Sequence, residues 1–247
     1  MNKQLMIYEN AVPVSLEQHR DISVRSGGSY SFAAGINSVP LVAAEFERAA
    51  AEYPIVFAGE GDALAPAAIL GLHDGENLFL KPDGSWDGAY IPAFLRRYPF
   101  VFASTGENGE TLTLCLDDAF DGVNRDGRGE RLFDAEGERT QYLKSVLQFT
   151  SDYQAQHNLT RRLVARLNEL KLFEPATAQI TLPDGTGHTL AGFQRVSQDR
   201  LRGLDDATVV ELFRSDMLGL IHAHLTSLGQ LQGLLRRRTA PAPAAAD

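Results

Sequence analysis

The sequence lacks the residues on which several classes of protein depend. Among its 247 residues there is one cysteine, Cys115, which excludes a disulfide framework and every metal site built from several cysteines. Its 23 lysines and arginines are outnumbered by 32 aspartates and glutamates, so the net charge is −9, and the longest basic run is residues 236–238. Nucleic acids and anionic membranes bind to concentrated positive charge, so neither is an expected partner.

Long hydrophobic segments are also scarce. Glu9 interrupts the first residues before the apolar region of an export signal could form. Residues 217–235 carry no formal charge, but only 10 of these 19 residues are apolar, and His222 and His224 lie among them. We therefore expect a core helix here rather than a membrane span. The expected location is cytoplasmic, with a surface location reached by another export route as the alternative.

The first 137 residues have the pattern of an antiparallel sheet. Turn-forming pairs such as Asp-Gly and Asn-Gly separate short apolar runs that are rich in aliphatic and aromatic residues. Two short helices interrupt these runs, one over residues 41–52 after Pro40 and one over residues 91–97. The predicted strands, all placed in one sheet, are residues 53–58, 68–72, 77–80, 98–103 and 111–116.

After residue 137 the apolar spacing lengthens from two residues to about 3.6, which indicates helices. Two helices are predicted before Pro175, followed by a hairpin of residues 177–182 and 188–196. Asp205 or Asp206 is expected to cap the next helix.

The combined pattern predicts an α+β fold. It is β-rich over residues 1–137 and mainly helical over residues 138–238, with one late hairpin and a disordered tail at residues 239–247. Because the late hairpin can pair with the early sheet, we favour one compact domain over two.

Familiar catalytic and cofactor motifs are absent. There is no Gly-x-Ser-x-Gly elbow, no phosphate-binding loop and no His-Glu-x-x-His, so we assign no catalytic residue and no cofactor. His222 and His224 are separated by about 200° on a helix and cannot easily share one metal ion. The acidic residues 118–136 do not fit the ligand spacing of an EF-hand loop. We therefore predict no metal site, and interpret Cys115 as a small buried residue.

The most unusual stretch is residues 81–100, here called the aromatic segment. It contains the only tryptophan, Trp86, together with two tyrosines, two adjacent arginines and three prolines. Aromatic faces and guanidinium groups suit sugars, peptides or carboxylates, and proline restricts the backbone that presents them.

Two interpretations of the aromatic segment follow. In the first, a ligand or partner is bound by Trp86, Tyr90, Arg96, Arg97, Tyr98 and His222. In the second, Trp86, Tyr90, Phe94 and Phe100 are core residues joined by a rigid turn.

The chain resembles the bacterial SapC family over about residues 12–235. No single fragment is specific, but their order and spacing cover most of the chain. The segments that carry the resemblance are PL at 40–41, EF at 45–46, EYPIVF at 52–57, LGL at 70–72, NLF at 77–79, Trp86 with YIP at 90–92, RRYPF at 96–100, RLFD at 131–134 with Gly137, and LGLIHAHLTSL at 218–228.

The resemblance implies two kinds of role. The family name refers to a bacterial surface layer, which implies a structural or surface function. Similar proteins look like intracellular products encoded near outer-membrane TonB-dependent receptors, which implies an accessory role in nutrient uptake or processing. We therefore predict a non-catalytic accessory or binding protein with a protein or small-molecule partner, and keep a structural surface-layer component as an alternative.

A second alternative is an enzyme of unrecognised type acting on a small molecule. Its polar residues would come from His73, Arg96, Arg97, His222 and His224. This hypothesis requires at least three of the five to converge in one concave site.

Overall fold

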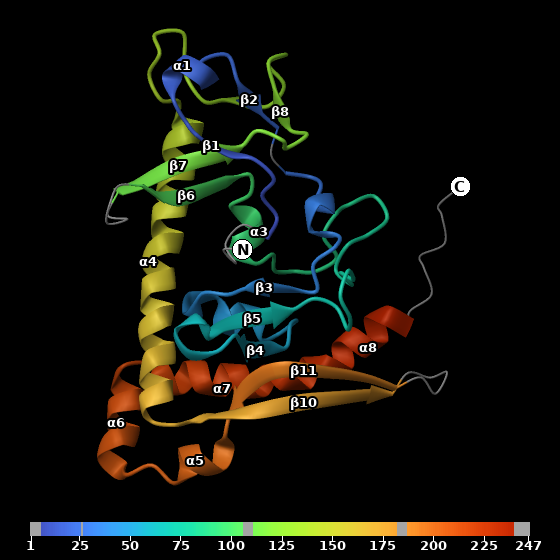
Figure 1. Ribbon diagram of the computed structural model, residues 1–247, viewed down its shortest axis with the longest axis vertical. Coiled ribbons are helices and arrows are strands. Elements are labelled where there is room, and N and C mark those ends of the chain that lie inside the picture. The colour runs from blue at the N-terminus through green and yellow to red at the C-terminus, as the bar shows by residue number, and fades with distance from the viewer. Residues whose placement is uncertain (1–5, 26, 106–110, 182–186, 240–247) are drawn as a thin grey trace.

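The computed structural model describes residues 6–25, 27–105, 111–181 and 187–239 (Figure 1). Antiparallel sheets dominate the first half of the chain and helices dominate the second, which confirms the α+β class. The tail predicted at residues 239–247 lies outside the described residues, except for Thr239, which ends α8.

A five-stranded sheet contains strands from both halves of the chain, in the order β10-β11-β4-β5-β3. The predicted pairing of the late hairpin with an early strand is confirmed, because Phe193 lies opposite Ala58 and Gln194 opposite Phe57. The strands are β3 (Ser38–Pro40), β4 (Ile55–Ala58), β5 (Ala65–Ile69), β10 (Phe173–Thr181) and β11 (Gly187–Val196).

Two three-stranded sheets lie at the other end of the molecule (Figure 1). One has the order β1-β7-β6 and the other β8-β2-β9. Their strands are β1 (Ala11–Pro13), β2 (Ser23–Val24), β6 (Phe100–Thr105), β7 (Thr111–Asp117), β8 (Val123–Asn124) and β9 (Glu130–Arg131).

The prediction of a single early sheet is wrong, because β4 and β5 belong to one sheet and β6 and β7 to another. The strand predicted at residues 77–80 is also absent, apart from one bridge between Leu80 and Trp86. Here the Asn77 side chain donates to the carbonyl oxygen of Ala33 and accepts from the N–H of Phe79. These side-chain hydrogen bonds take the place of strand pairing.

One long helix, α4 (Gln141–Glu169), extends from the three-stranded sheets at one end of the molecule to the five-stranded sheet at the other (Figure 1). The prediction of two helices is wrong, because residues 154–158 contain neither glycine nor proline and the helix continues through them. Thr140 caps its first turn by accepting the N–H of Leu143. Leu143 packs in the core of the three-stranded sheets, whereas Leu167 packs in the larger core of the five-stranded sheet.

The helical segments before β6 are short. The helix predicted at residues 41–52 is a 3-10 turn, η3 (Ala43–Glu45), that continues into α2 (Phe46–Ala49). Pro40 ends β3 instead of starting this helix, and β3 is an edge strand, where proline is tolerated. The others are α1 (Leu16–His19), η2 (Ser31–Ala33), η4 (Gly61–Ala63) and α3 (Ala93–Arg96), the last within the predicted 91–97 helix.

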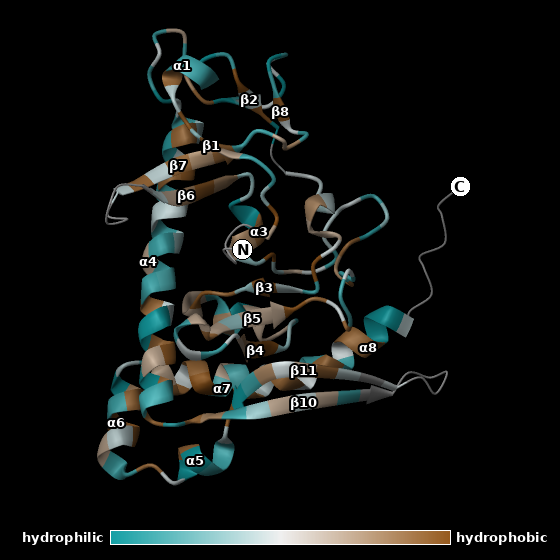
Figure 2. Ribbon diagram, in the orientation of Figure 1, coloured by the Kyte–Doolittle hydropathy of each residue, from teal (hydrophilic) through white to brown (hydrophobic). Residues whose placement is uncertain are grey.

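Several helices follow β11, and one of them, α7, packs on the five-stranded sheet. Asp205 caps α6 as predicted, accepting the N–H of Thr208 at 2.9 Å. Figure 2 shows hydrophobic residues along α7, which packs on β4 and β11. Within the described residues, every helix is too short or too polar to span a membrane. These helices are α5 (Gln198–Arg202), α6 (Asp206–Arg214), α7 (Met217–Ser227), η5 (Leu228–Gln230) and α8 (Leu231–Thr239).

Candidate functional site

Trp86, the tryptophan of the aromatic segment, lies in the protein core. Trp86 is only 8% exposed, and its ring stacks on Phe79 with 5.8 Å between centroids. Its indole N–H donates a 3.0 Å hydrogen bond to the hydroxyl of Tyr53, which in turn donates to the carbonyl oxygen of Tyr90. Burial raises the pKa of Tyr53, so this hydroxyl keeps the proton that it donates. Trp86 therefore anchors the segment to the core.

Two carboxylates fix the next part of the segment. Glu52 accepts the backbone N–H of Ala89 at 2.6 Å and that of Tyr90 at 3.3 Å. The buried carboxylate of Glu45 accepts the Tyr90 hydroxyl at 2.8 Å and the N–H of Ala93 at 2.7 Å. Burial, followed by the charge of Glu45, raises the pKa of Tyr90 to about 12, so Tyr90 remains a donor at neutral pH.

These contacts place Tyr90 and Arg96 on the wall of a groove between α2, α3 and α4, here called the Arg96 groove. Its volume is about 420 Å³. Exposed charges of both signs line it, together with three aromatic rings. The lining residues are Val42, Ala44, Glu45, Glu47, Arg48, Tyr90, Ala93, Arg96, Phe149, Asp152, Tyr153 and Gln156.

Arg96 is exposed and lies between two of these rings. Its Nε donates to the carbonyl oxygen of Ile91 at 2.9 Å, which fixes the side chain. The guanidinium carbon lies 5.1 Å from the Phe149 ring centroid and 5.8 Å from that of Tyr90. Among the described residues no acidic side chain pairs with this guanidinium. An anionic group entering the groove would therefore meet an arginine that is already positioned.

Arg97, in contrast, is 5% exposed and points into the core. Its guanidinium carbon lies 4.6 Å from the ring centroids of both Phe94 and Tyr153, and 5.9 Å from that of Tyr8. Its Nε and Nη2 atoms are buried and have no hydrogen-bond partner within the described residues. Arg97 thus lies directly behind the groove wall that Tyr153 forms.

Tyr98 belongs to a different surface. Its ring stacks on Phe32 at 4.1 Å between centroids, and its hydroxyl donates to Asp117 at 3.2 Å. Burial and the charge of Asp117 raise the pKa of Tyr98. It lines a separate groove of about 740 Å³ with Arg25 and Phe120, among others.

The five residues of the enzyme hypothesis lie in separate surroundings. His73 is exposed in the loop after β5 and contacts Glu76, and His222 is exposed on α7. His224 is fully buried: it accepts the N–H of Val196 at Nε2, and its Nδ1 is 2.8 Å from the carbonyl oxygen of Ile55.

Arg96 alone of the five lines the Arg96 groove, Arg97 and His224 are buried, and His73 and His222 are exposed on a loop and on α7. The convergence that this hypothesis requires is therefore not found. The structure confirms the expectation that Cys115 is buried, and the burial of His224 fits the core helix expected over residues 217–235. Within the described residues, no group of three or more His, Cys, Asp or Glu side chains could hold a metal ion.

Of the residues that line the groove, only Tyr90 and Arg96 were predicted from the sequence, and Glu45, Phe149 and Tyr153 were not. Glu45 lies in the EF fragment of the family resemblance, which was a signal without an assigned role. Phe149 and Tyr153 fall in the helical apolar spacing after residue 137, and no local pattern links them to Arg96.

The groove and its supporting residues lie within a region shared with other proteins. No curated protein and no solved structure matches the chain. A family model, SapC, matches residues 14–234. This span includes the aromatic segment, α4 and α7, and it covers most of the chain, so the protein belongs to the SapC family.

Proposed function

We propose that this protein is a non-catalytic accessory or binding protein, and that the Arg96 groove receives its ligand or partner. The observation that carries the proposal is the exposed Arg96 guanidinium, held between the rings of Tyr90 and Phe149 without an acidic partner among the described residues. The separation of the candidate catalytic residues also supports a role without catalysis.

The chemistry of the groove favours a carboxylate that is attached to an apolar group. The carboxylate would accept hydrogen bonds from Arg96, and the apolar group would pack against Phe149 and Tyr153. Glu47 and Asp152 add negative charge at the rim and would disfavour ligands that carry several negative charges. A volume of about 420 Å³ is enough for a small molecule or for a short stretch of a peptide.

In this proposal the predicted residues have different roles. Tyr90 and Arg96 contact the ligand, whereas Trp86 and Arg97 hold the wall of the groove from behind. Tyr98 and His222 lie on other surfaces and take no part in it. The proposal includes a cytoplasmic location and the link to nutrient uptake through TonB-dependent receptor systems that the family resemblance implies.

The test is purification from native cells under mild conditions, with mass spectrometry of the proteins and small molecules that co-elute. The informative variant is Arg96→Gln, because Arg96 is exposed and its loss should leave the core intact. Arg162→Gln, on an exposed part of α4 outside the groove, is the matched control. We expect a component that the wild type and Arg162→Gln retain and Arg96→Gln loses. Equal retention by all three proteins, or retention of nothing, would overturn the proposal.

A further inference from the structure

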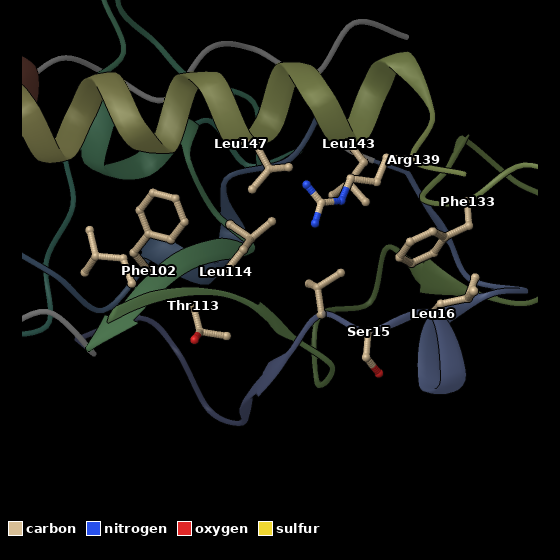
Figure 3. Close-up of a pocket in the computed structure, with 11 residues that line it drawn as sticks. Ser15, Leu16, Phe102, Thr113, Leu114, Phe133, Arg139, Leu143 and Leu147 are labelled. Atoms are coloured by element: carbon tan, nitrogen blue, oxygen red, sulfur yellow. The ribbon is translucent and has the colours of Figure 1, made fainter. Parts of the chain in front are cut away.

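A second hollow lies on nearly the opposite side of α4, between that helix and the β1-β7-β6 sheet (Figure 3). Its volume is about 550 Å³. Leu147 lines it, and residues two apart on a helix, such as Leu147 and Phe149, are separated by about 200°. It is therefore independent of the Arg96 groove. This apolar pocket is lined mainly by Phe102, Leu114, Phe133, Leu143 and Leu147, with Arg139 as its one charged residue.

Arg139 gives the apolar pocket its distinctive chemistry. Figure 3 shows its guanidinium directed between Leu143 and Phe133 toward the interior of the pocket. Its backbone is fixed by a bridge to Phe133 and by the start of α4 at the next residues. Within the described residues, the guanidinium has no ion pair or hydrogen bond. An anionic ligand in the pocket could pair with this guanidinium without displacing another carboxylate.

The rim of the apolar pocket also exposes hydrophobic surface. Leu16 is 41% exposed and Leu112 is 43% exposed, and both line the pocket. An apolar chain lying in the pocket would cover them and release water from their surface. The volume of the pocket is in the range of small-molecule sites. A stable protein–protein interface would have to extend over a much larger surface than this pocket.

We propose that the apolar pocket binds a medium-chain fatty acid, with the carboxylate on Arg139 and the alkyl chain along Leu114, Leu143 and Leu147. The inference does not depend on the proposed function, since the two sites share no lining residue. One carboxylate satisfies the one cation, and an unbranched chain suits walls made of leucine and phenylalanine.

Isothermal titration of the full-length protein with octanoate, decanoate and dodecanoate tests this proposal. We expect one site, with Kd falling roughly twofold to fourfold for each added methylene that becomes buried. Arg139→Gln should weaken dodecanoate binding by about tenfold or more, because a charge-assisted hydrogen bond is lost. Leu147→Trp should abolish binding by filling the pocket, and Arg162→Gln should bind like the wild type.

Three results would overturn the proposal. They are failure of all three acids to bind the wild type, binding that Arg139→Gln and Leu147→Trp leave unchanged, and a dimer of the wild type that Leu147→Trp dissociates. The last result would make a second copy of the chain the occupant. Arg139 is exposed, so its substitution should not impair folding, and circular dichroism of each variant checks this.

Discussion

The indole N–H of Trp86 donates a 3.0 Å hydrogen bond to the hydroxyl of Tyr53. The same hydroxyl donates to the carbonyl oxygen of Tyr90, whose own hydroxyl donates to Glu45 in the Arg96 groove. The backbone and the side chain of Tyr90 therefore connect the core to the groove wall through hydrogen bonds. A change at Trp86 should reach the groove through the position of Tyr90, although Trp86 does not line it.

Substitutions at the two ends of this hydrogen bond should differ in cost. Trp86→Phe removes one donor and some buried volume, and should lower the free energy of unfolding by about 1–2 kcal/mol. Tyr53→Phe leaves both the Trp86 indole N–H and the Tyr90 carbonyl unpaired in a buried place, and should cost more, about 2–4 kcal/mol. Urea unfolding followed by circular dichroism measures both. If both variants stay within about 0.5 kcal/mol of the wild type, these hydrogen bonds do not contribute to stability.

The buried Arg97 should contribute little to stability. Its guanidinium gains attraction from the Phe94 and Tyr153 rings, worth about 2 kcal/mol when desolvated, but its own desolvation costs several kcal/mol and no carboxylate offsets that. Arg97→Met keeps most of the volume and should leave the unfolding free energy unchanged or raise it. Arg97→Ala opens a cavity and should lower it by about 2–3 kcal/mol. A loss above about 2 kcal/mol in Arg97→Met would show that the charge itself stabilises the core.

His224 should make stability depend on pH. Burial lowers the pKa of His224 from 6.5 to about 4 in the folded protein, while in the unfolded chain it stays near 6.5. Between these values the unfolded state binds a proton that the folded state does not. The free energy of unfolding should therefore fall by roughly 3 kcal/mol as the pH falls from 6.5 to 4.

The variant His224→Gln isolates this contribution. It should be less stable than the wild type at pH 7, because glutamine cannot reproduce both the bond from Val196 and the bond to Ile55. Its stability should also fall less between pH 6.5 and pH 4. Denaturant midpoints measured across that range give the comparison, and identical slopes for the two proteins would rule out the assigned role of His224.

Parts of the fold could be predicted from local sequence pattern. Asp205 precedes a helical apolar spacing and caps α6, and His224 falls on the apolar stripe of α7 and is buried. The division of the early strands between two sheets could not be predicted, because strand pairing depends on contacts between distant residues. The continuous helix α4 was missed because its apolar spacing shifts where it passes from one core to the other.

The candidate site was predictable only in part. Arg96 and Tyr90 were identified from composition, and both line the groove. Burial separates Trp86 and Arg97 from them, although Arg96 and Arg97 are neighbours in the sequence. The opposite wall comes from Phe149 and Tyr153, more than 50 residues later, and only the tertiary packing of α4, which contacts η3 and places Phe149 by Arg96, brings it there.

The measurement that tests the account most directly is site-specific photo-crosslinking in native cells. A photoreactive phenylalanine analogue replaces Phe149, a half-buried aromatic residue of the Arg96 groove, and in a matched variant replaces Leu159, which is 47% exposed on α4 outside the groove. Mass spectrometry then identifies adducts at each position. The account predicts a specific adduct at position 149 that position 159 lacks, and that is lost when Arg96→Gln is added. The same adducts at both positions, or none at position 149, would contradict it.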